Sequence, residues 1–298
     1  MDIGMVGLGR MGGNMALRLA RGGHRVVGFD RAGARGEVAE LETVQSLPEL
    51  VAALPVPRVV WLMVPAGAPV DLTLDQLLPL LQPGDVVVDG GNSNYHDSER
   101  RAARCSDAGV HFLDCGTSGG VWGLQEGYSL MIGGEAGAVA LLRPVFETLA
   151  PAPDRGWGHV GPSGAGHFTK MVHNGIEYGM MQAYAEGFAI MQRKEAMALD
   201  LAQVAKIWQH GSVVRSWLLD LAADALEQNP TLEGIAPYVS DSGEGRWTVA
   251  EAIELDVSAP VITLSLLERL RSREKDSYAD KMLAALRQGF GGHGIRPG

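Results

Sequence analysis

The stretch of sequence that decides the fold is residues 3–12, which read Ile-Gly-Met-Val-Gly-Leu-Gly-Arg-Met-Gly. Its first half is a short apolar run typical of a buried β-strand, and its second half has the Gly-x-Gly-x-x-Gly pattern that opens a helix. In that pattern Gly7 permits a tight turn, Gly9 lets a pyrophosphate approach the backbone, and Gly12 allows close packing of helix on strand. The stretch therefore predicts a dinucleotide-binding domain of the Rossmann type.

Asp30 ends the next predicted strand, about 20 residues after the glycine loop. A carboxylate there accepts hydrogen bonds from the adenosine ribose and repels a 2′-phosphate, which favours NAD over NADP. Arg31 beside it can stack on adenine or hold a 2′-phosphate, so we expect NAD preference with some use of NADP. Further contacts are expected where two later strands end, because ligands of open α/β sheets bind there. The predicted cofactor residues are Gly7, Leu8, Gly9, Arg10, Met11, Gly12, Asp30, Arg31, Val64, Pro65, Ala66 and Asn92.

The first half of the chain alternates short β-rich runs with helical patterns, which is typical of βαβ units and a parallel sheet. Strands are predicted at 3–7, 25–30, 58–64, 85–89, 110–114, 129–132 and 158–160, with a helical stretch at 136–149. After the turn residues at 161–164 the composition favours helices to the end of the chain. These are predicted at 165–194, 200–210, 213–228, 247–256 and 260–288. We therefore expect a Rossmann-type α/β domain over residues 1–162 and an all-α domain over residues 163–298.

The composition is that of an ordinary globular protein, since 46% of the 298 residues are hydrophobic and 20% are charged. The net charge of −10 argues against non-specific binding to nucleic acid or to anionic membranes, which needs a basic surface. Cys105 and Cys115 form neither a Cys-x-x-Cys pair nor a ligand cluster with His, so we expect reduced thiols and no metal. The sequence has no apolar run of about 18 residues and no signal-peptide pattern, so the expected location is the cytoplasm.

A second informative stretch is residues 166–178, Gly-His-Phe-Thr-Lys-Met-Val-His-Asn-Gly-Ile-Glu-Tyr. Five polar side chains recur there at helical spacing and so share one face of a helix: Lys170, His173, Asn174, Glu177 and Tyr178. Apolar neighbours such as Met171, Ile176 and Met181 predict a largely buried helix, so the polar stripe is expected to line a cavity. A buried Lys and Glu are costly unless they are paired or hydrogen-bonded, and function is a common reason to retain them.

With these motifs in view, the chain resembles the 6-phosphogluconate dehydrogenases, in particular their short, NAD-preferring bacterial form, within the β-hydroxyacid dehydrogenase superfamily. Five blocks carry the resemblance and together span nearly the whole chain: residues 7–14, 89–93, 118–120, 164–178 and 287–293. The block at 164–178 is highly specific, because the wider superfamily keeps a Lys and an Asn on this helix but lacks the continuation from His173 to Tyr178.

The resemblance implies oxidation of 6-phospho-D-gluconate at carbon 3 by hydride transfer to the nicotinamide, followed by loss of CO2 to give D-ribulose 5-phosphate. Lys170 is similar to the family's general base, which takes the hydroxyl proton and afterwards supports the keto intermediate as an acid. Because a free Lys is protonated at neutral pH, the site must lower its pKa. Glu177 is similar to the family's general acid, which protonates carbon 1 of the enediol. It must be protonated at that step, which a secluded carboxyl can achieve.

The resemblance also implies which residues hold the substrate. The sugar carboxylate and hydroxyls are expected to contact Asn92, Ser118, Gly119, Gly120, His173 and Asn174. Tyr178 and Arg269 match the family's phosphate contacts, whereas Arg287 and His293 match a C-terminal arm that reaches the active site of a partner subunit. The second domain is then a substrate and dimerisation domain, and a homodimer is implied. Because the long form's second helical segment is missing, a homotetramer is also possible.

The sequence departs from the family at one position that bears on the substrate. Longer members carry a Lys before Gly-x-Gly-Lys-Trp, whereas Ser242 precedes Gly-Glu-Gly-Arg-Trp at residues 243–247 here. Either Arg246 compensates for the missing cation, or the site accepts a less charged sugar acid.

Two alternative functions follow. The first is another β-hydroxyacid dehydrogenase that acts on a small or unphosphorylated acid. Arg269, Arg287 and His293 argue against it, because a small acid needs no distant phosphate clamp. The second, from a different class, is a non-catalytic dinucleotide sensor or structural subunit. The presence of both Lys170 and Glu177 argues against that function.

Overall fold

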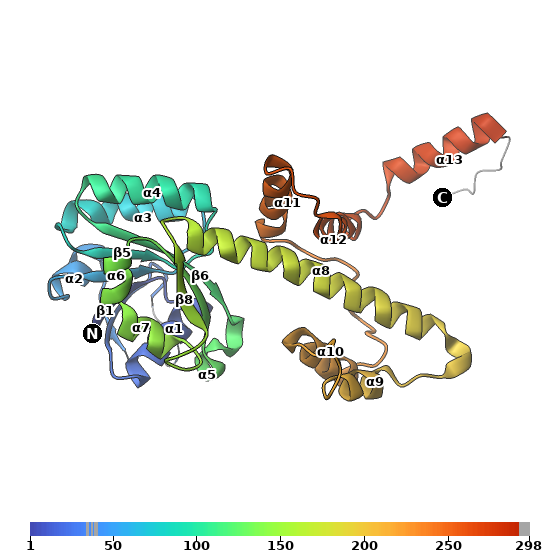
Figure 1. The fold of residues 1–298 in the computed structure, drawn as a ribbon, viewed down its shortest axis with the longest axis horizontal. Helices are drawn as coiled ribbons and strands as arrows, with labels where there is room; N and C mark the ends of the chain where they lie inside the picture. The colour runs from blue at the N-terminus through green and yellow to red at the C-terminus, as the bar shows by residue number, and fades with distance from the viewer. Residues whose placement is uncertain (34–35, 37, 39–40, 292–298) are drawn as a thin grey trace. The chain divides into compact units, whose positions relative to one another are not determined.

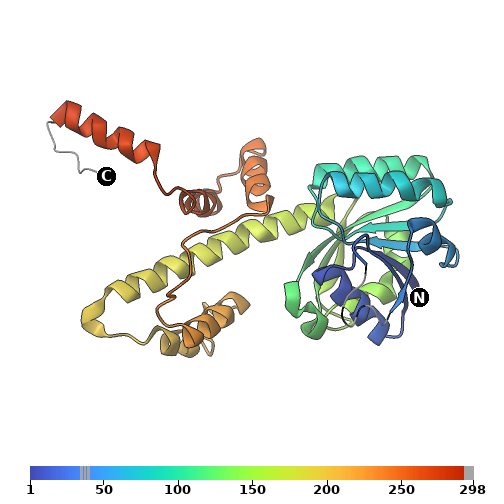
Figure 2. The same cartoon turned by 180° about the vertical axis from the view of Figure 1, so that it is seen from behind.

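The computed structural model of the chain describes residues 1–291 except residues 34–35, 37 and 39–40. The chain forms two compact units, Met1–Asn174 and Gly175–Gly298. Helix α8 (Ala165–Arg193) begins in the first unit and ends in the second (Figures 1 and 2). The two units divide inside this helix, between Asn174 and Gly175, whereas the sequence predicts a domain boundary after residue 162. A division into compact units does not test where the domains begin, so that boundary stays a prediction.

The first unit is built on one eight-stranded sheet. Its strands are β1 (Asp2–Val6), β2 (Arg25–Phe29), β3 (Glu42–Thr43), β4 (Val59–Leu62), β5 (Val86–Asp89), β6 (His111–Ser118), β7 (Ser129–Gly133) and β8 (Trp157–Gly161). They lie in the order β3-β2-β1-β4-β5-β6-β7-β8, and neighbours pair in parallel except β6 and β7, which are antiparallel. The predicted strands and the Rossmann-type parallel sheet are confirmed. The prediction omits β3, whose two exposed residues are too short a run to show a pattern.

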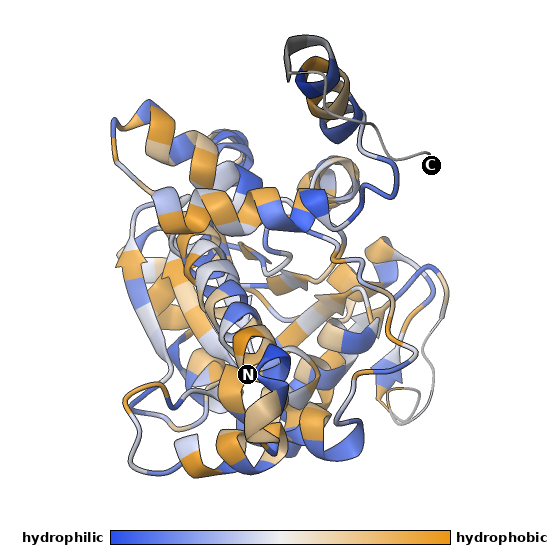
Figure 3. Ribbon diagram, turned by 90° about the vertical axis from the view of Figure 1, so that its right-hand side faces the viewer, coloured by the Kyte–Doolittle hydropathy of each residue, from blue (hydrophilic) through white to orange (hydrophobic). Residues whose placement is uncertain are grey.

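Helices cover both faces of this sheet and bury a separate apolar core on each face (Figure 1). The helices of the first unit, apart from α8, are α1 (Arg10–Arg21), α2 (Leu47–Ala52), α3 (Ala68–Leu77), α4 (Tyr95–Asp107), α5 (Gly123–Glu126), α6 (Ala136–Leu141) and α7 (Arg143–Leu149). One core joins α1, α6 and α7 to the sheet and includes Met15 and Phe146, and the other joins α2, α3 and α4 and includes Leu50 and Leu74. The strands between them carry mostly hydrophobic residues (Figure 3), as expected for a sheet covered on both sides.

The helical stretch predicted at 136–149 is divided into α6 and α7 at Leu142. Pro144 lies in the first turn of α7, where its missing N–H leaves no helical bond unmade. Inside one continuous helix the same ring would remove a hydrogen bond and clash with the preceding turn.

The second unit is helical, as predicted. Its helices after α8 are α9 (Leu201–Trp208), α10 (Trp217–Gln228), α11 (Glu244–Glu254), α12 (Pro260–Arg271) and α13 (Tyr278–Gly291). The single helix predicted at 260–288 is wrong, because residues 272–277 separate α12 from α13. There the hydroxyl of Ser277 accepts the N–H of Asp280 at 3.3 Å, a cap that favours a new helix start. Likewise α10 begins at Trp217 rather than at residue 213, because the Ser216 hydroxyl caps it.

The expectation that α8 is largely buried is wrong for its second half. Met171 is buried, but Ile176, just before the middle of the helix, is 53% exposed and Ile190, in its second half, is 72% exposed in the single chain. The helix has 29 residues, so it is roughly 44 Å long and exceeds the helices of 8 to 14 residues that accompany it in the second unit. Neither α8 nor any other helix in the described part of the chain has the apolar length to cross a membrane.

Candidate active site

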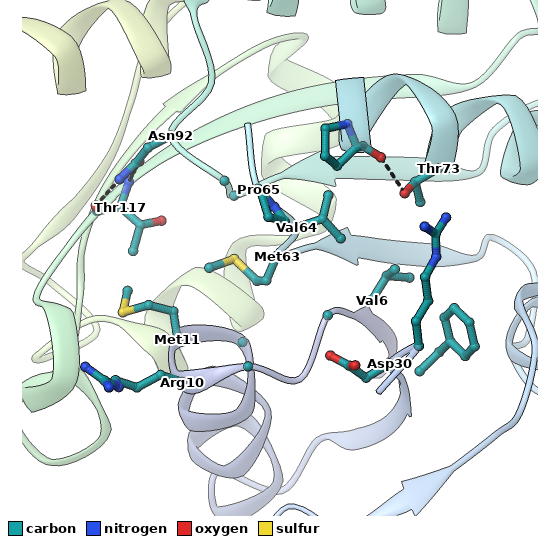
Figure 4. Close-up of a pocket in the computed structure, with 18 of the residues that line it drawn as sticks. Val6, Arg10, Met11, Asp30, Met63, Val64, Pro65, Thr73, Asn92 and Thr117 are labelled. Atoms are coloured by element: carbon teal, nitrogen blue, oxygen red, sulfur yellow. Dashed lines mark hydrogen bonds between the residues drawn. The ribbon is translucent and has the colours of Figure 1, made fainter. Parts of the chain in front are cut away.

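A pocket of about 720 Å³ opens at the ends of strands β1, β2, β4 and β5 (Figure 4). From β1 the strand order runs outwards in both directions, to β2 and β3 on one side and to β4 and β5 on the other. Ligands of open α/β sheets bind beside such a reversal of strand order. The pocket is lined by Val6, Gly7, Gly9, Arg10, Met11, Gly12, Phe29, Asp30, Arg31, Leu47, Met63, Val64, Pro65, Pro69, Thr73, Gly90, Gly91, Asn92 and Thr117. All of the predicted cofactor residues line it except Leu8 and Ala66.

The glycine loop has the backbone that a dinucleotide site needs. Gly7 has φ +92°, and a side chain there would meet the Met63 carbonyl oxygen at 2.4 Å. A side chain on Gly12 would meet the carbonyl oxygen of Gly7 at 2.0 Å, so α1 packs directly on the turn. At Gly9, by contrast, a side chain would meet nothing within 4 Å. The N-terminus of α1 is therefore open to a pyrophosphate, and the loop fits a nicotinamide dinucleotide.

The carboxylate of Asp30 holds the glycine loop as well as facing the pocket. One of its oxygens accepts the N–H of Leu8 at 2.7 Å, and the other accepts the N–H of Ala32 at 2.7 Å. Leu8 thus contributes through its backbone. Figure 4 shows Asp30 on the side of the pocket opposite Asn92. A carboxylate has about four acceptor positions, so two backbone bonds leave room for ribose hydroxyls.

A buried arginine supports the loop that follows β5. Arg101 of α4 is fully buried and donates to Asp89 at 3.3 Å and to both oxygens of Asp71 at 3.0 Å. The hydrogen bonds from Arg101 lower the pKa of Asp71 to about 2. The carboxylate of Asp89 in turn accepts the N–H of Gly91 at 3.1 Å and the hydroxyl of Ser93 at 2.7 Å. This network fixes the backbone on one wall of the pocket.

Asn92 joins that loop to the end of β6. Its amide nitrogen donates to the carbonyl oxygen of Thr117 at 3.1 Å (Figure 4), and its amide oxygen accepts the Thr117 N–H at 2.9 Å. The residue has φ +51°, a conformation that Asn adopts more readily than most residues. Ser118, the next residue after Thr117, ends β6, and Gly119 and Gly120 follow with φ +132° and +51°. The predicted substrate residues at 118–120 are therefore attached to the wall of the dinucleotide pocket.

Three residues of the polar stripe form one cluster in the first unit. Lys170 is only 5% exposed, its ammonium donates to Oδ1 of Asn174, and it lies 3.3 Å from Nδ1 of His173. The side chains of His173 and Asn174 are 3.1 Å apart. A side chain on Gly116 of β6 would meet Cβ of Lys170 at 2.4 Å, so the helix packs against this strand. The Lys170 cluster thus lies beside β6, one residue before Thr117 of the pocket.

Helix α8 is held at its start by a buried acid. Asp114 of β6 is fully buried, and its carboxylate accepts the N–H of Gly164 at 2.6 Å and that of His167 at 2.8 Å. An anion at a helix N-terminus is favourable because the first N–H groups lack partners in the helix. Nδ1 of His167 lies 2.7 Å from the hydroxyl of Ser98 on α4. Sequence reasoning missed these residues, because no local pattern distinguishes a buried Asp from an exposed one.

In the second unit, a guanidinium group stacks on the predicted phosphate tyrosine. Tyr178 is buried, and the guanidinium carbon of Arg269 lies 3.5 Å from the centre of its ring. A side chain on Gly245 would meet Cε2 of Tyr178 at 2.4 Å, so the start of α11 also packs against the ring. The structure therefore brings together Tyr178 and Arg269, two of the predicted phosphate residues. It also places beside them residues 243–247, the segment that Ser242 precedes in place of the family's lysine.

Arg246, next to this contact, belongs to a charged cluster that was not predicted. It pairs with both oxygens of Asp241, at 3.0 and 3.2 Å, and Arg273 donates to the same carboxylate at 2.6 Å. These hydrogen bonds, from Arg246 first, lower the pKa of Asp241 to about 2. The hydroxyl of Ser242 donates to the buried carboxylate of Glu244. Two guanidinium groups thus share the carboxylate of Asp241, whereas Arg269 donates to the carbonyl oxygen of Ser240 at 3.0 Å.

The remaining predicted residues are placed as follows. Glu177 is half-buried on α8, and Arg287 is exposed on α13. His293 lies outside the described residues.

Comparison with known families assigns both halves of the chain. Residues 2–160 match the family model described as the NAD binding domain of 6-phosphogluconate dehydrogenase. Residues 166–293 match the model described as the 6-phosphogluconate dehydrogenase C-terminal domain. The two models meet between residues 160 and 166.

Individual relatives agree with these models. A protein of Haloferax volcanii named NAD(+)-dependent, decarboxylating 6-phosphogluconate dehydrogenase is 48% identical over 299 residues, which cover 99% of this chain and 98% of the relative. The decarboxylating 6-phosphogluconate dehydrogenase of Treponema pallidum is 39% identical over 93% of this chain but only 60% of its own length. Among solved structures, the 6-phosphogluconate dehydrogenase of Plasmodium falciparum aligns with all of this chain and 66% of its own, with a TM-score of 0.83 and 29% identity.

Proposed function

Because the chain belongs to the 6-phosphogluconate dehydrogenase family, we propose that it oxidises 6-phospho-D-gluconate and decarboxylates the product to D-ribulose 5-phosphate and CO2. A relative of nearly the same length carries the decarboxylating name, which supports the whole reaction rather than oxidation alone. The observation that carries the proposal is the buried Lys170 cluster beside β6, the strand that borders the dinucleotide pocket. A dehydrogenase needs a base within reach of a hydroxyl that faces the nicotinamide.

NAD is the cofactor proposed, with NADP as a second choice. When bound, it supplies the hydride acceptor. The glycine loop and the start of α1 hold the pyrophosphate, while Asp30 accepts the ribose hydroxyls and disfavours a 2′-phosphate. The name of the Haloferax volcanii relative supports this preference. Arg31, which also lines the pocket, offers a 2′-phosphate a cationic partner, and this supports NADP as the second choice.

Lys170 is the proposed general base and acid at carbon 3. It takes the proton of the substrate hydroxyl as the hydride leaves, and it then donates a proton to the keto oxygen as the carboxylate departs. Asn174 and His173 orient its amine, and Gly116 lets the lysine backbone lie directly against β6. An amine that is held in a fixed position near the end of β6 suits a base that acts on one defined hydroxyl.

Glu177 is the proposed acid at carbon 1. It follows Lys170 by seven residues, two turns along the same continuous helix, so the two side chains leave α8 on the same face. The base would act at carbon 3 and the acid at carbon 1 of one sugar chain. Asn92, Ser118, Gly119, Gly120, His173 and Asn174 are the proposed contacts to the substrate carboxylate and hydroxyls.

For the substrate phosphate we propose Tyr178, Arg269 and Arg246. Arg269 stacks on Tyr178, and Arg246 follows the glycine that packs on the same ring. Guanidinium groups suit phosphate because they donate two parallel hydrogen bonds. Arg246 thus supplies the cation that Ser242 does not, which favours the phosphorylated substrate over a less charged sugar acid.

A homodimer or homotetramer is proposed, in which Arg287 and His293 complete the site of a partner subunit. Apolar side chains that are exposed in the single chain support a subunit interface on the second unit: Ile176, Met180, Met181, Ile190, Ile207 and Val213. A cytoplasmic location is proposed as well, in keeping with the sugar-phosphate substrate.

The proposed function is tested by initial rates of NADH formation with 6-phosphogluconate and with gluconate, each repeated with NADP, while released CO2 is trapped. We expect phosphate-dependent turnover with one CO2 for each NADH and a higher rate with NAD. Turnover of gluconate without CO2 would instead indicate a simple hydroxyacid dehydrogenase. No turnover of either acid would contradict the assignment as an enzyme of this class.

A further inference from the structure

The backbone that follows β6 is rich in glycine and needs support from elsewhere. Residues 119–127, called here the 119–127 loop, contain four glycines and include a short 3₁₀ turn (Gly120–Trp122) and α5. Gly119, Gly120 and Gly127 have positive φ angles. Glycine has the widest choice of backbone conformations, so ordering it costs more entropy than ordering other residues. The loop begins directly after Ser118, and its own first residues are proposed substrate contacts.

Two asparagines hold the chain at and just before the start of this loop. Asn92, from the segment after β5, makes two hydrogen bonds to the backbone of Thr117, two residues before the loop. Asn14, on α1, donates to the carbonyl oxygen of Val121 at 3.4 Å. Both come from elements that line the dinucleotide pocket.

Arg18 holds the back of the loop. One of its terminal nitrogens donates to the carbonyl oxygens of Leu124 at 3.1 Å and Gln125 at 3.3 Å, which lie in α5. Its other nitrogens donate to the carbonyl oxygens of Thr148 at 3.0 Å and Ala150 at 2.7 Å, at the end of α7. One guanidinium therefore joins the loop to a second segment of the same unit.

The contacts on both sides of Arg18 reinforce this connection. The N–H of Tyr128, just after the loop, donates to the Leu149 carbonyl oxygen at 2.9 Å. A side chain on Gly127 would meet the backbone nitrogen of Pro151 at 2.4 Å, so the two segments lie in direct contact. Arg18 thus bridges the loop and residues 148–150 at a place where both backbones are already close.

Arg18 also connects the loop to the cofactor site. Arg10, Asn14 and Arg18 lie at i, i+4 and i+8 on α1, so they form one stripe along the helix. Arg10 starts the helix and lines the pocket where the pyrophosphate is proposed to bind. The same rigid helix therefore carries the cofactor contact at its first turn and the loop contacts on the turns that follow.

From this arrangement we propose that Arg18 is a positioning residue for the substrate, which fixes the 119–127 loop so that Ser118, Gly119 and Gly120 are held ready to bind it. The proposal rests on the proposed function, in which these three residues contact 6-phosphogluconate. Arg18 touches neither substrate nor cofactor in this role. A planar group with five N–H donors suits it, because four carbonyl oxygens on two segments must be reached at once, and a lysine has only three donors at a single nitrogen.

The test compares Arg18→Met and Arg18→Lys with the unmodified protein. We expect Arg18→Met to raise the KM for 6-phosphogluconate by about tenfold or more, because a small misplacement of a binding loop is enough for such an effect. The dissociation constant for NADH, measured by its fluorescence, should change by less than about twofold, since α1 keeps its place in the core. Arg18→Lys should give an intermediate KM, which a role in stability alone would not predict. Arg104→Met is the matched control, because Arg104 lies on α4 and pairs with Asp75 at the surface.

An unchanged KM in folded Arg18→Met would overturn the proposal, and so would a parallel rise in KM and in the NADH dissociation constant, which indicates general loosening. Thermal melting identifies folded variants. If Arg18→Met does not fold, Arg18→Lys decides by the same two constants: a KM rise at constant NADH affinity supports the proposal, and an unchanged KM overturns it. Failure of the unmodified protein to turn over 6-phosphogluconate overturns the proposed function itself, and is thereby distinguished from failure of Arg18's role.

Discussion

Single polar side chains that line the pocket bind the protein backbone and also face the space proposed for the ligand. Asp30 accepts the N–H of Leu8, and Asn92 exchanges two hydrogen bonds with Thr117. Removing one partner of such a bond leaves a buried polar group unpaired, at a cost of about 1–3 kcal/mol. Substitutions at these residues are therefore expected to change both the shape of the site and the proposed ligand contacts, which a second substitution or a control must separate.

Lys170→Ala should lower the rate of NADH formation by a factor of about 10² to 10⁴, because the substrate hydroxyl loses its base. Binding of NADH, followed by its fluorescence, should remain, since the pocket at the ends of β1, β2, β4 and β5 does not include this side chain. Lys206→Ala is the control, because this exposed lysine pairs with Glu227 on the second unit. Turnover at the unmodified rate in Lys170→Ala would refute the base assignment.

Replacement of Asp30 should shift the cofactor preference towards NADP. In Asp30→Asn the amide oxygen can still accept the Leu8 N–H, so the contact to the glycine loop is kept, while the charge and the acceptor for the Ala32 N–H are lost. We expect the ratio of kcat/KM for NAD to that for NADP to fall by about tenfold, since charge repulsion against the 2′-phosphate disappears. Asp30→Ala should shift the ratio similarly but weaken both cofactors, because the loop contact goes too. An unaltered ratio in both variants would exclude a ribose role.

Substitution of Arg246 tests whether the site is built for a phosphorylated substrate or for a less charged sugar acid. Arg246→Gln should raise the KM for 6-phosphogluconate by about tenfold through loss of a charge-assisted contact, with no effect on the KM for NAD. Adding Ser242→Lys to that variant should recover part of the loss, because a cation returns to the same segment. Arg271→Gln serves as the control, since Arg271 is an exposed arginine paired with Glu274. An unchanged KM in Arg246→Gln would place the phosphate elsewhere.

Whole elements were predictable from sequence where burial imposes a pattern. Strands β4 and β5 are buried on both faces and read Val-Val-Trp-Leu and Val-Val-Val-Asp, so their apolar runs are unambiguous. The break between α12 and α13 was missed because Ser277 caps a helix only when the chain has already turned, which composition does not show. The exposure of the second half of α8 was missed because apolar residues predict burial but do not show whether the same chain or a second subunit covers them.

The element α4 provides a prediction about acid stability. Arg101 of α4 lowers the pKa of Asp71 on α3 from 3.8 to about 2. A lowered carboxyl pKa stabilises the folded protein fully above the unfolded value, near pH 4, and the stabilisation disappears as pH falls towards 2. Asp71→Asn should therefore lower the free energy of unfolding by about 1–2 kcal/mol at pH 7, a figure reduced because the side chain is partly exposed.

Urea unfolding of the two proteins at several pH values tests this sign. The difference in free energy should be constant from pH 7 to pH 5 and should shrink below pH 4, where the wild-type carboxyl takes up its proton. Asp75→Asn, which removes a more exposed ion pair with Arg104, should show a much smaller difference. A difference that persists unchanged below pH 4 would mean that the charge of Asp71 is not its source.

At the scale of the molecule, the residues that line the pocket were easier to predict from the sequence than the residues that hold its backbone in place. The glycine loop, Asp30 and Asn92 all lie at strand ends, and the rule that parallel strands end at one edge brings them together. Arg18 and Arg101 were not predicted, because each contacts residues about 30 to 130 positions away and charged side chains are usually exposed. The Lys170 cluster was predictable in part, since helical spacing groups its members but gives no partner from β6.

The proposed arm also belongs to this scale, because it requires a second subunit. A chain that ends after Arg287 lacks His293 and should show a KM for 6-phosphogluconate raised by a factor on the order of ten, owing to loss of a charged or polar contact. The mixing of two variants tests whether the arm acts in trans. If it does, a mixed oligomer of truncated subunits and full-length Lys170→Ala subunits contains one site with both Lys170 and an intact arm.

Mixing these two variants should then restore activity at low substrate concentration above that of either variant alone. Truncated Lys170→Ala mixed with full-length Lys170→Ala should stay inactive, and native mass spectrometry must confirm that mixed oligomers form. Mixed oligomers without recovered activity would assign the arm to its own subunit's site, because only the trans arrangement separates the lysine and the arm onto different chains.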